Sequence, residues 1–179
     1  NFANKIWNAG RFLLMNKESL VELGSKTSKL KSSKQEKASL PSPAGEKEAA
    51  SSELYLDLAD RWILSRLQST IRSLKEAFDA FEINMAAKTL YDFTWHDFCD
   101  WYLELIKDRI DPSKDRESRE VILNRALWVF EETLKLLHPF MPFLTEEIWQ
   151  TLDKRKNKES IMTQPYPVLQ PHLIDETSE

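Results

Sequence analysis

The stretch LADRWILSRLQSTIRSLKEAFDAF, residues 58–81, decides how this chain folds. Its large apolar side chains recur every three or four residues, at Leu64, Leu67, Ile71, Leu74, Phe78 and Phe81. This spacing puts them on one face of an α-helix, because an α-helix turns once every 3.6 residues or so. We therefore expect residues 58–81 to form one long helix with a buried apolar face.

A second helix is expected over residues 84–110, with Asn84 as its N-cap. It should end at Asp111-Pro112, since proline cannot continue a helix. The connection from the first helix is short, so the two helices should pack as antiparallel neighbours. The side chains expected to face the core are Trp95, Phe98, Tyr102 and Leu105.

A third helix is expected from about Asp115 to His138, where Pro139 and Pro142 stop it. Its expected inward side chains are Leu123, Leu127, Phe130, Leu134 and Leu137. A shorter helix should follow, with Thr145 as its cap. Glu146 and Glu147 would lie near the positive end of the helix dipole. The apolar side of the helix would be formed by Ile148, Trp149 and Leu152.

The opening segment NFANKIWNAGRFLLMN, residues 1–16, has the pattern of a helix with an unusual polar side. Its apolar positions are Phe2, Ile6, Ala9 and Leu13, and its polar side carries Asn4, Asn8, Arg11 and Met15, with Lys5 and Phe12 at the edge. Solvated helix faces usually mix cations with Glu, yet this face has no carboxylate. Amides, cations and an aromatic ring suit an anionic partner that contains rings.

Together these patterns predict an all-α protein, because no segment shows the two-residue alternation of a half-buried strand. We expect an elongated antiparallel bundle of about five helices. All six tryptophans lie in the predicted helices, and their large rings are expected to fill a wide core.

The domain organisation follows from composition. Residues 24–52 lack aromatic residues and are rich in Ser and Lys, so they should form a flexible insertion in a domain of residues 1–168. Residues 169–179 are expected to be a tail or linker. The start of the chain inside a helix, without Met, suggests a fragment of a longer polypeptide. With one cysteine and no apolar run of about 18 residues, the chain should be soluble and intracellular.

Charge places an anion-binding surface toward the N-terminal side. The net charge is −4, yet residues 1–52 carry 9 basic and 5 acidic residues, and residues 53–179 carry 16 and 24. The acidic excess of the second part has an equally good explanation as a solubilising surface.

The sequence contains little that indicates a catalytic or a metal-binding site. No glycine-rich phosphate loop is present. His96 and Cys99 are three residues apart, but no second His or Cys pair accompanies them. Asp97, Asp100 and Glu104 recur at helical spacing. They are more simply explained as a solvated face, or as partners of Arg or Lys, than as a catalytic acid/base pair. We therefore expect no catalytic residue and no metal site.

Five segments, taken in order, resemble the tRNA anticodon-binding domain of bacterial-type valyl-tRNA synthetases, which are class I aminoacyl-tRNA synthetases. These segments are NFANKIWNAGRFLLMN, LADRWILSRL, TLYDFTWHDFCDWYLELIKDR, HPFMPFLTEEIWQ and ESIMTQPYP. Helical anticodon domains are shared by several synthetases, but FCDWYLE (98–104) and IMTQPYP (161–167) point to the valine enzyme. The family pattern NKxWNAxRF matches residues 4–12, with Gly10 where Ala is more usual.

The resemblance implies that the chain binds the anticodon loop of valine tRNA. Loop bases are read by flat surfaces and by groups that match base edges, and phosphates by cations. The residues that the resemblance places at the loop are Arg11, Asn8, Phe12 and Lys5, with Arg61 and Trp62 as a second contact. Trp7 is more simply a core residue.

The resemblance also implies what lies outside these residues. The longer enzyme would be cytoplasmic and would use ATP and magnesium. Its catalytic domain is the expected intramolecular partner of this stretch, which itself would need no cofactor. The fragment itself should be monomeric and have no ligase activity. The alternative is a helical module that docks a protein or another domain and reads no RNA. RNA binding would depend steeply on salt, whereas protein docking would depend on it weakly.

Overall fold

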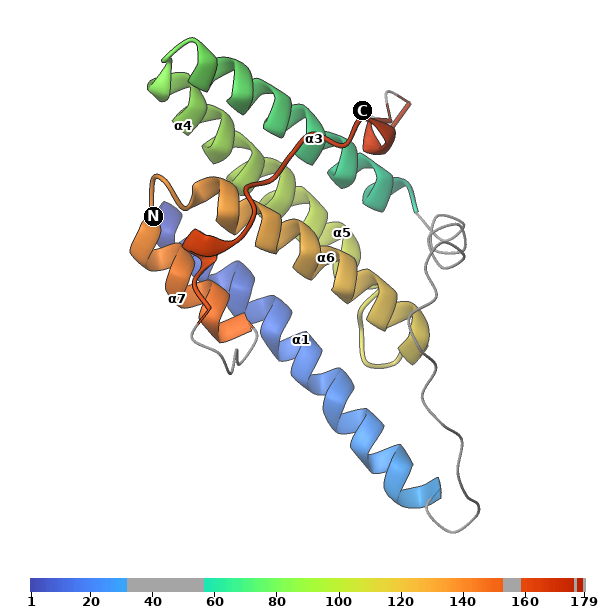
Figure 1. Cartoon of the computed structure of the whole chain (residues 1–179). Helices are drawn as coiled ribbons and strands as arrows, with labels where there is room; N and C mark the ends of the chain where they lie inside the picture. Colours follow the sequence, from blue (N-terminus) through green and yellow to red (C-terminus); the bar gives the residue numbers. More distant parts are fainter. Residues whose placement is uncertain (32–56, 153–158, 176, 179) are drawn as a thin grey trace, which may run out of the picture.

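A computed structural model describes residues 1–31, 57–152, 159–175 and 177–178. Within these ranges all regular structure is helical and no strand occurs, so the expected all-α bundle is confirmed. The helices form five rods (Figure 1): α1 (Phe2–Lys31), α3 (Leu58–Asp79), a continuous rod of α4 (Ile83–Asp92), η2 (Phe93–Tyr102) and α5 (Leu103–Lys107), then α6 (Arg116–Leu137) and α7 (Pro142–Leu152). Two single turns, η3 (Ile161–Thr163) and η4 (Pro171–Leu173), follow.

Helices α3 and α4 form the antiparallel hairpin that the sequence predicts (Figure 1). The four central positions of the α3 stripe are buried: Leu64, Leu67, Ile71 and Leu74. Phe78 is half-buried, but the expected inward position of Phe81 is wrong, because the side chain is 88% exposed. The helix has already ended at Asp79, so Phe81 leaves the helical face.

Backbone hydrogen bonds close the turn between α3 and α4. The N–H of Glu82 donates to Ala77 O at 2.8 Å and that of Phe81 to Phe78 O at 3.0 Å. This pattern needs a left-handed residue after the helix, usually Gly, and here Phe81 takes it with a φ of 58°. Because Glu82 O accepts the first bonds of α4, α4 begins at Ile83, and the expectation that Asn84 caps it is wrong.

The middle of the second rod is a π-helix, η2, which the sequence did not reveal. Its hydrogen bonds reach back five residues rather than four, so buried positions are five apart, as in Phe93 and Phe98 or Thr94 and Cys99. Phe98 and Tyr102 face the core as expected. The other two expectations are wrong, since the wider turn rotates them outward: Trp95 is half-buried and Leu105 is 50% exposed.

Helix α6 agrees with its prediction. Asp115 caps it by accepting from Ser118 N at 2.9 Å, and all five predicted leucine and phenylalanine positions are buried. Helix α7 begins earlier than expected, at Pro142, a favoured first residue. The expectation that Thr145 caps α7 is therefore wrong. Its buried hydroxyl donates to Met141 O at 3.0 Å, and the predicted acidic first turn lies one turn further on.

Helix α1 packs on α6, η2 and α7 through Ile6, Ala9 and Leu13. Gly10 is buried where α1 meets α6 and α7. A Cβ there would lie 3.0 Å from Ile148 Cγ2 and 3.1 Å from Phe130 Cε1. The missing side chain therefore allows a close approach of the helices. Residues 24–31 of the predicted insertion belong to α1, and residues 32–52 lie outside the described residues.

A buried charge cluster joins three rods. Asp60 on α3 is completely buried and accepts a hydrogen bond from Tyr102 Oη at 2.9 Å and one from Arg109 Nη2 at 3.0 Å. Arg125 Nη1 on α6 lies 2.8 Å from the same carboxylate. We call these four residues the Asp60 cluster.

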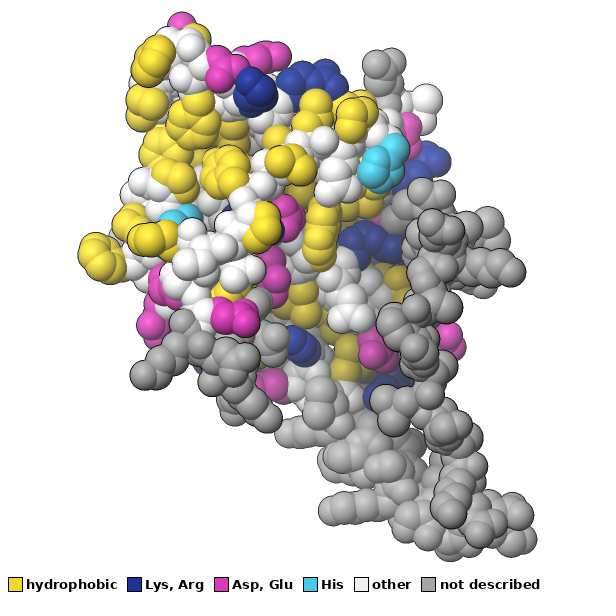
Figure 2. All heavy atoms as spheres, in the orientation of Figure 1, with side chains coloured by type: hydrophobic (Ala, Val, Ile, Leu, Met, Phe, Trp, Pro, Cys, Tyr) yellow, Lys and Arg dark blue, Asp and Glu magenta, His cyan; other side chains and the backbone are white. Residues whose placement is uncertain are grey.

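Tryptophan fills less of the core than expected. Trp149 is buried, whereas Trp7, Trp101 and Trp128 are 41%, 62% and 36% exposed. Figure 2 shows further apolar side chains on the surface, gathered around the α3–α4 end of the molecule.

The C-terminal segment runs across α7 and then along α3 (Figure 1). Glu146 on α7 accepts from Ser160 Oγ at 2.8 Å and from Ile161 N at 3.1 Å. Gln170 N then donates to Gln68 Oε1 at 2.7 Å, and Asp175 N donates to Ser65 Oγ at 3.0 Å. Part of the predicted tail, residues 169–179, is thus held against α3.

Candidate nucleic-acid interface

The outward face of α1 carries Asn4, Asn8 and Arg11, all exposed. None of the three side chains has a hydrogen bond or an ion pair with any residue that the structure describes. No acidic residue occurs in the chain before Glu18, so α1 places no carboxylate within one turn of Arg11. The face therefore offers amide and guanidinium donors in the geometry that the sequence predicts.

Lys5 is more constrained than its position at the edge of this face suggests. Its ammonium group forms an ion pair with Asp100 on η2 and lies 4.7 Å from the ring centroid of Trp95. The hydrogen bond from Lys5 lowers the pKa of Asp100, and His96 Nδ1, 3.4 Å away, contributes in the same direction. The cation of Lys5 is thus already shared between a carboxylate and an aromatic ring.

Phe12 lies on the same side of α1 as Lys5, and it is half-buried against the core. Asn16 Nδ2 donates to Phe12 O at 2.8 Å. One part of the Phe12 side chain thus anchors α1, and the remainder is available at the border of the exposed face.

A shallow apolar hollow of about 80 Å³ lies between α1 and α7 on the other border of the face. Trp7 and Arg11 line it, and the rest of its wall is Gly10, Leu14, Ile148, Thr151 and Leu152. Trp7 is not the core residue that the sequence favoured, since 41% of it is exposed. Arg11 therefore has an aromatic neighbour on its own helix.

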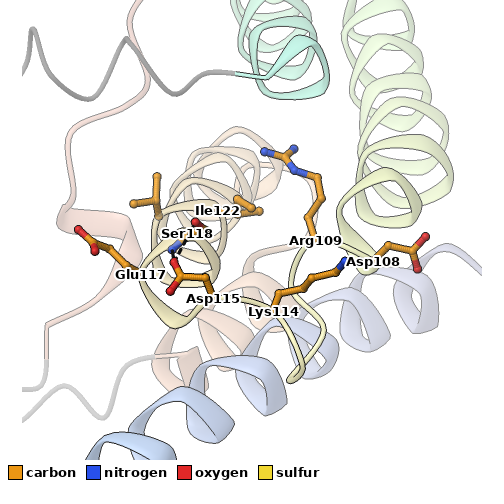
Figure 3. A pocket seen from close by; sticks show the side chains of 8 residues that line it. Asp108, Arg109, Lys114, Asp115, Glu117, Ser118 and Ile122 are labelled. Carbon is orange, nitrogen blue, oxygen red and sulfur yellow. Dashed lines mark hydrogen bonds between the residues drawn. The ribbon is translucent and has the colours of Figure 1, made fainter.

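A larger hollow of about 700 Å³ lies between the end of α5 and the start of α6 (Figure 3). Asp108, Asp115 and Glu117 outnumber its cations, Arg109 and Lys114. Arg109 is also committed to the Asp60 cluster. This hollow is therefore poorly suited to a phosphate.

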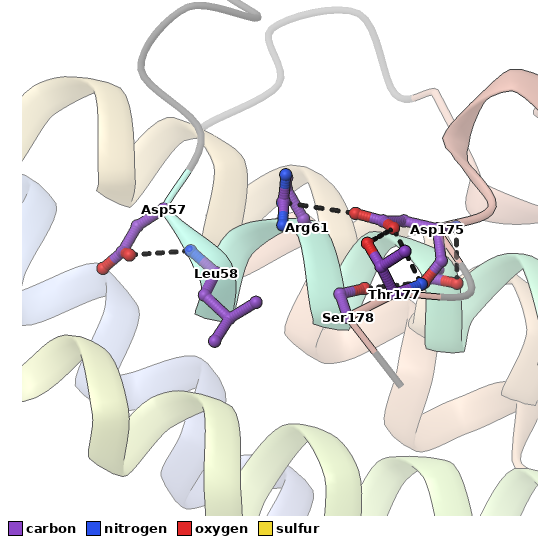
Figure 4. Close-up of polar contacts among 7 residues, drawn as sticks. Asp57, Leu58, Arg61, Asp175, Thr177 and Ser178 are labelled. Atoms are coloured by element: carbon purple, nitrogen blue, oxygen red, sulfur yellow. Dashed lines mark hydrogen bonds and ion pairs between the residues drawn. The ribbon is translucent and has the colours of Figure 1, made fainter.

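Arg61 and Trp62, at the start of α3, lie apart from the α1 residues. Arg61 Nε lies 3.2 Å from Asp175 Oδ2 (Figure 4), so the C-terminal segment shares its charge. Trp62 is half-buried and lines a hollow of about 440 Å³ with Trp101, Leu105 and Asp97. None of the residues predicted on α1 lines this hollow.

Trp101 is the aromatic residue that sequence reasoning misplaced most clearly. We expected Trp101, like the other tryptophans, to fill the core, but 62% of it is exposed, and it lines the same hollow as Trp62. Asp97, in the same wall, accepts from Arg66 Nε at 2.9 Å. Burial raises the pKa of Asp97 despite the nearby Arg66 charge. Trp101 lies in the π-helix η2, which nothing in the sequence marks.

The acidic and metal-ligating side chains weighed in the sequence are explained by packing and pairing. Glu104 pairs with Lys107, while Asp97 and Asp100 pair with Arg66 and Lys5. Cys99 is buried, which raises the pKa of its thiol to about 12. Within the described ranges no three His, Cys, Asp or Glu side chains are grouped to hold a metal ion. No helix in the same ranges is long and apolar enough to cross a membrane.

Comparison with known proteins identifies the family to which the chain belongs. Residues 60–179 match the family model described as the anticodon-binding domain of tRNA ligase. The chain is 42% identical over 178 residues to the valine–tRNA ligase of Fervidobacterium nodosum, covering 99% of the chain and 17% of that protein. It is 45% identical over 168 residues to the enzyme of Geobacter sulfurreducens, covering 93% and 16%. It is 39% identical over 178 residues to the valine–tRNA ligase of Thermotoga maritima, covering 99% of the chain and 17% of that protein. The chain thus spans only 16 to 17% of the length of these relatives.

Proposed function

The chain belongs to the family of anticodon-binding domains of tRNA ligases, and we propose that it binds the anticodon loop of valine tRNA. The relatives named above are valine–tRNA ligases, which supports the choice of tRNA. The observation that carries the proposal is the outward face of α1, where Asn8 and Arg11 are exposed and unpaired. Binding would position the tRNA for aminoacylation by a catalytic domain outside this stretch.

The face offers two kinds of group that loop recognition needs. Amide and guanidinium groups match the edges of unstacked bases, and aromatic rings stack on base faces. We assign base-edge contacts to Asn8 and Arg11, and stacking to the exposed part of Phe12. Lys5 would reach a phosphate only by leaving Asp100.

We also propose Arg61 and Trp62 as a second contact. Arg61 would have to share its charge with Asp175, whereas Trp62 has a partly open ring beside Trp101. In the longer ligase, ATP and magnesium would act at the catalytic domain. We also propose that the enzyme works in the cytoplasm and that the chain alone is a monomer, with residues 1–168 as the domain.

The test is binding of the 179-residue chain to a valine anticodon stem-loop and to the same loop with its central adenine replaced. Arg11→Ala should weaken binding of the cognate loop by roughly 1 to 3 kcal/mol, because a base-edge contact is lost. The difference in affinity between the cognate loop and the altered loop should become smaller for the same reason. Arg72→Ala, an exposed arginine on α3, is the matched control and should change neither value.

The salt dependence separates this function from protein docking. Binding through phosphates should weaken with salt with a log–log slope of about −0.7 per phosphate contacted. If the wild-type chain binds neither loop, or if Arg11→Ala leaves binding and discrimination unchanged in a folded chain, the outward face of α1 does not read the anticodon.

A further inference from the structure

Two phenylalanines are almost fully exposed at one end of the bundle. Phe81 in the α3–α4 turn is 88% exposed, and Phe143 in the first turn of α7 is 90% exposed. Ile83 and Met85, at the start of α4, are 53% and 45% exposed. We call these four side chains the apolar end surface. Figure 2 shows apolar side chains over this end of the molecule. Concentrated exposure of this kind marks interaction sites in soluble proteins.

The two turns adjoin one another. Phe78 near the end of α3 stacks on Phe140 in the α6–α7 turn, with ring centroids 6.3 Å apart and an interplanar angle of 20°. The N-terminus lies at the same end of the bundle (Figure 1). Phe2 in the first turn of α1 packs on Tyr91 of α4, with centroids 4.9 Å apart. The first turn of α1 therefore packs on the α3–α4 hairpin, on the side of Tyr91.

The backbone at Phe81 shows that its side chain contributes little to this fold. A φ of 58° is unfavourable for a bulky side chain and easy for glycine. At 88% exposure the ring gains little packing in return. Strained backbone conformations of this kind cluster at functional sites. A partner that buries the ring would supply that use.

We propose that the apolar end surface docks the rest of the ligase polypeptide, an inference that rests on the proposed membership of this chain in a longer ligase. The relatives are about six times as long as the matched stretch, so a large body must be attached to the bundle. RNA is a poor fit here, because Phe81 is flanked by Asp79 and Glu82, and Lys75 is paired with Asp79.

The direct test is hydroxyl-radical footprinting of the full-length ligase and of the 179-residue chain. The rings of Phe81 and Phe143 should be oxidised several-fold more slowly in the full-length protein, without tRNA. Leu58, 57% exposed at the opposite end of α3, is the matched control and should react equally in both. Equal oxidation of both phenylalanines in the two proteins would overturn the proposal.

Two other outcomes would assign the surface to another partner and also overturn it. Protection that appears only after tRNA is added would identify RNA as the cover. Protection in the 179-residue chain that grows with protein concentration would identify a second copy. Stem-loop binding by the 179-residue chain is measured separately, so a failure of the proposed anticodon function is distinguishable from a failure of docking.

A pair of variants tests the role of the ring. Phe81→Gly and Phe81→Ala both remove it, but only glycine relieves the backbone. In the 179-residue chain, Phe81→Gly should unfold at a higher urea concentration than Phe81→Ala, and stem-loop affinity should stay at the wild-type value in both. In the full-length ligase, each variant combined with Phe143→Ser should slow charging of tRNA and leave valine activation unchanged. Unchanged charging in both combinations would contradict docking through these rings.

Discussion

The Asp60 cluster and the outward face of α1 both carry arginine, and they use it in opposite ways. In the cluster, Arg109 and Arg125 converge on one carboxylate that is completely buried. On α1, Arg11 is exposed and has no partner among the described residues. The comparison teaches that the arginines of the cluster hold the rods together, whereas Arg11 remains available to a ligand.

Burial explains why the cluster must be complete. A buried charge loses its hydration, and only close partners compensate for the loss. Asp60 has three such partners, one of which is the hydroxyl of Tyr102. Burial first, and then the charge of Asp60, raise the pKa of Tyr102 well above its ordinary value. The cluster therefore contributes to stability as a unit, and its members should not be interchangeable with polar substitutes.

The largest expected effect is that of Asp60→Asn. The substitution keeps the shape but leaves two arginines without their buried counter-charge, so the free energy of unfolding should fall by roughly 3 to 5 kcal/mol. Urea unfolding followed by circular dichroism measures it. Asp92→Asn is the control, because Asp92 is exposed on α4 and lies outside the cluster. Equal losses from both variants would mean that the cluster has no special role.

A smaller loss is expected from Tyr102→Phe. The ring stays in place, but Asp60 Oδ1 loses its donor, which should cost about 1.5 to 3 kcal/mol because the acceptor is charged. The same urea experiment measures the loss. Cys99→Ser, one turn away in η2 and also buried, tests whether any polar change in this rod has the same effect. A loss below that range for Tyr102→Phe would show that the two arginines alone satisfy Asp60.

The stabilisation by Tyr102 should also depend on pH at the alkaline end. Its pKa is raised in the folded protein, so the folded state favours the protonated phenol. Stability from this group is complete below its unfolded pKa of about 10 and declines as pH rises above it. The difference in unfolding free energy between wild type and Tyr102→Phe should therefore be constant from pH 7 to 9 and shrink above pH 10. A difference that grows above pH 10 would contradict the raised pKa.

The sequence predicted the two regions unequally well. Amphipathic spacing places Arg11 and Asn8 on the exposed side of α1, and the structure agrees, because a helix exposed on one side obeys a single period. Nothing local marks Asp60 as a hub, since its partners are 42, 49 and 65 residues away. The sequence singled out Arg61 and Trp62 beside it, whose roles depend on Asp175 and on the neighbouring Trp101.

The π-helix shows a second limit of sequence reasoning. Applying a 3.6-residue period through residues 93–102 turned Trp95 and Leu105 inward, whereas the wider turn of η2 moves them outward. The same change brings Asp97 to Arg66 and Asp100 to Lys5. The sequence offered Asp100 a basic partner without naming it, because that partner, Lys5, lies 95 residues away in the chain.

The smallest expected effect concerns Lys5, which belongs to α1 but is paired with Asp100 on η2. Its ion pair with Asp100 is partly exposed, with 30% and 37% of the two side chains accessible. A double-mutant cycle with Lys5→Met and Asp100→Asn should give a coupling of only about 0.2 to 1 kcal/mol. Asp100→Asn should nevertheless tighten stem-loop binding, since it releases the Lys5 cation toward a phosphate, and the salt slope should steepen by about 0.7. Adding Lys5→Met should remove both changes. If Asp100→Asn alters neither affinity nor slope, Lys5 is a structural residue, and Arg11 carries the positive charge of this face alone.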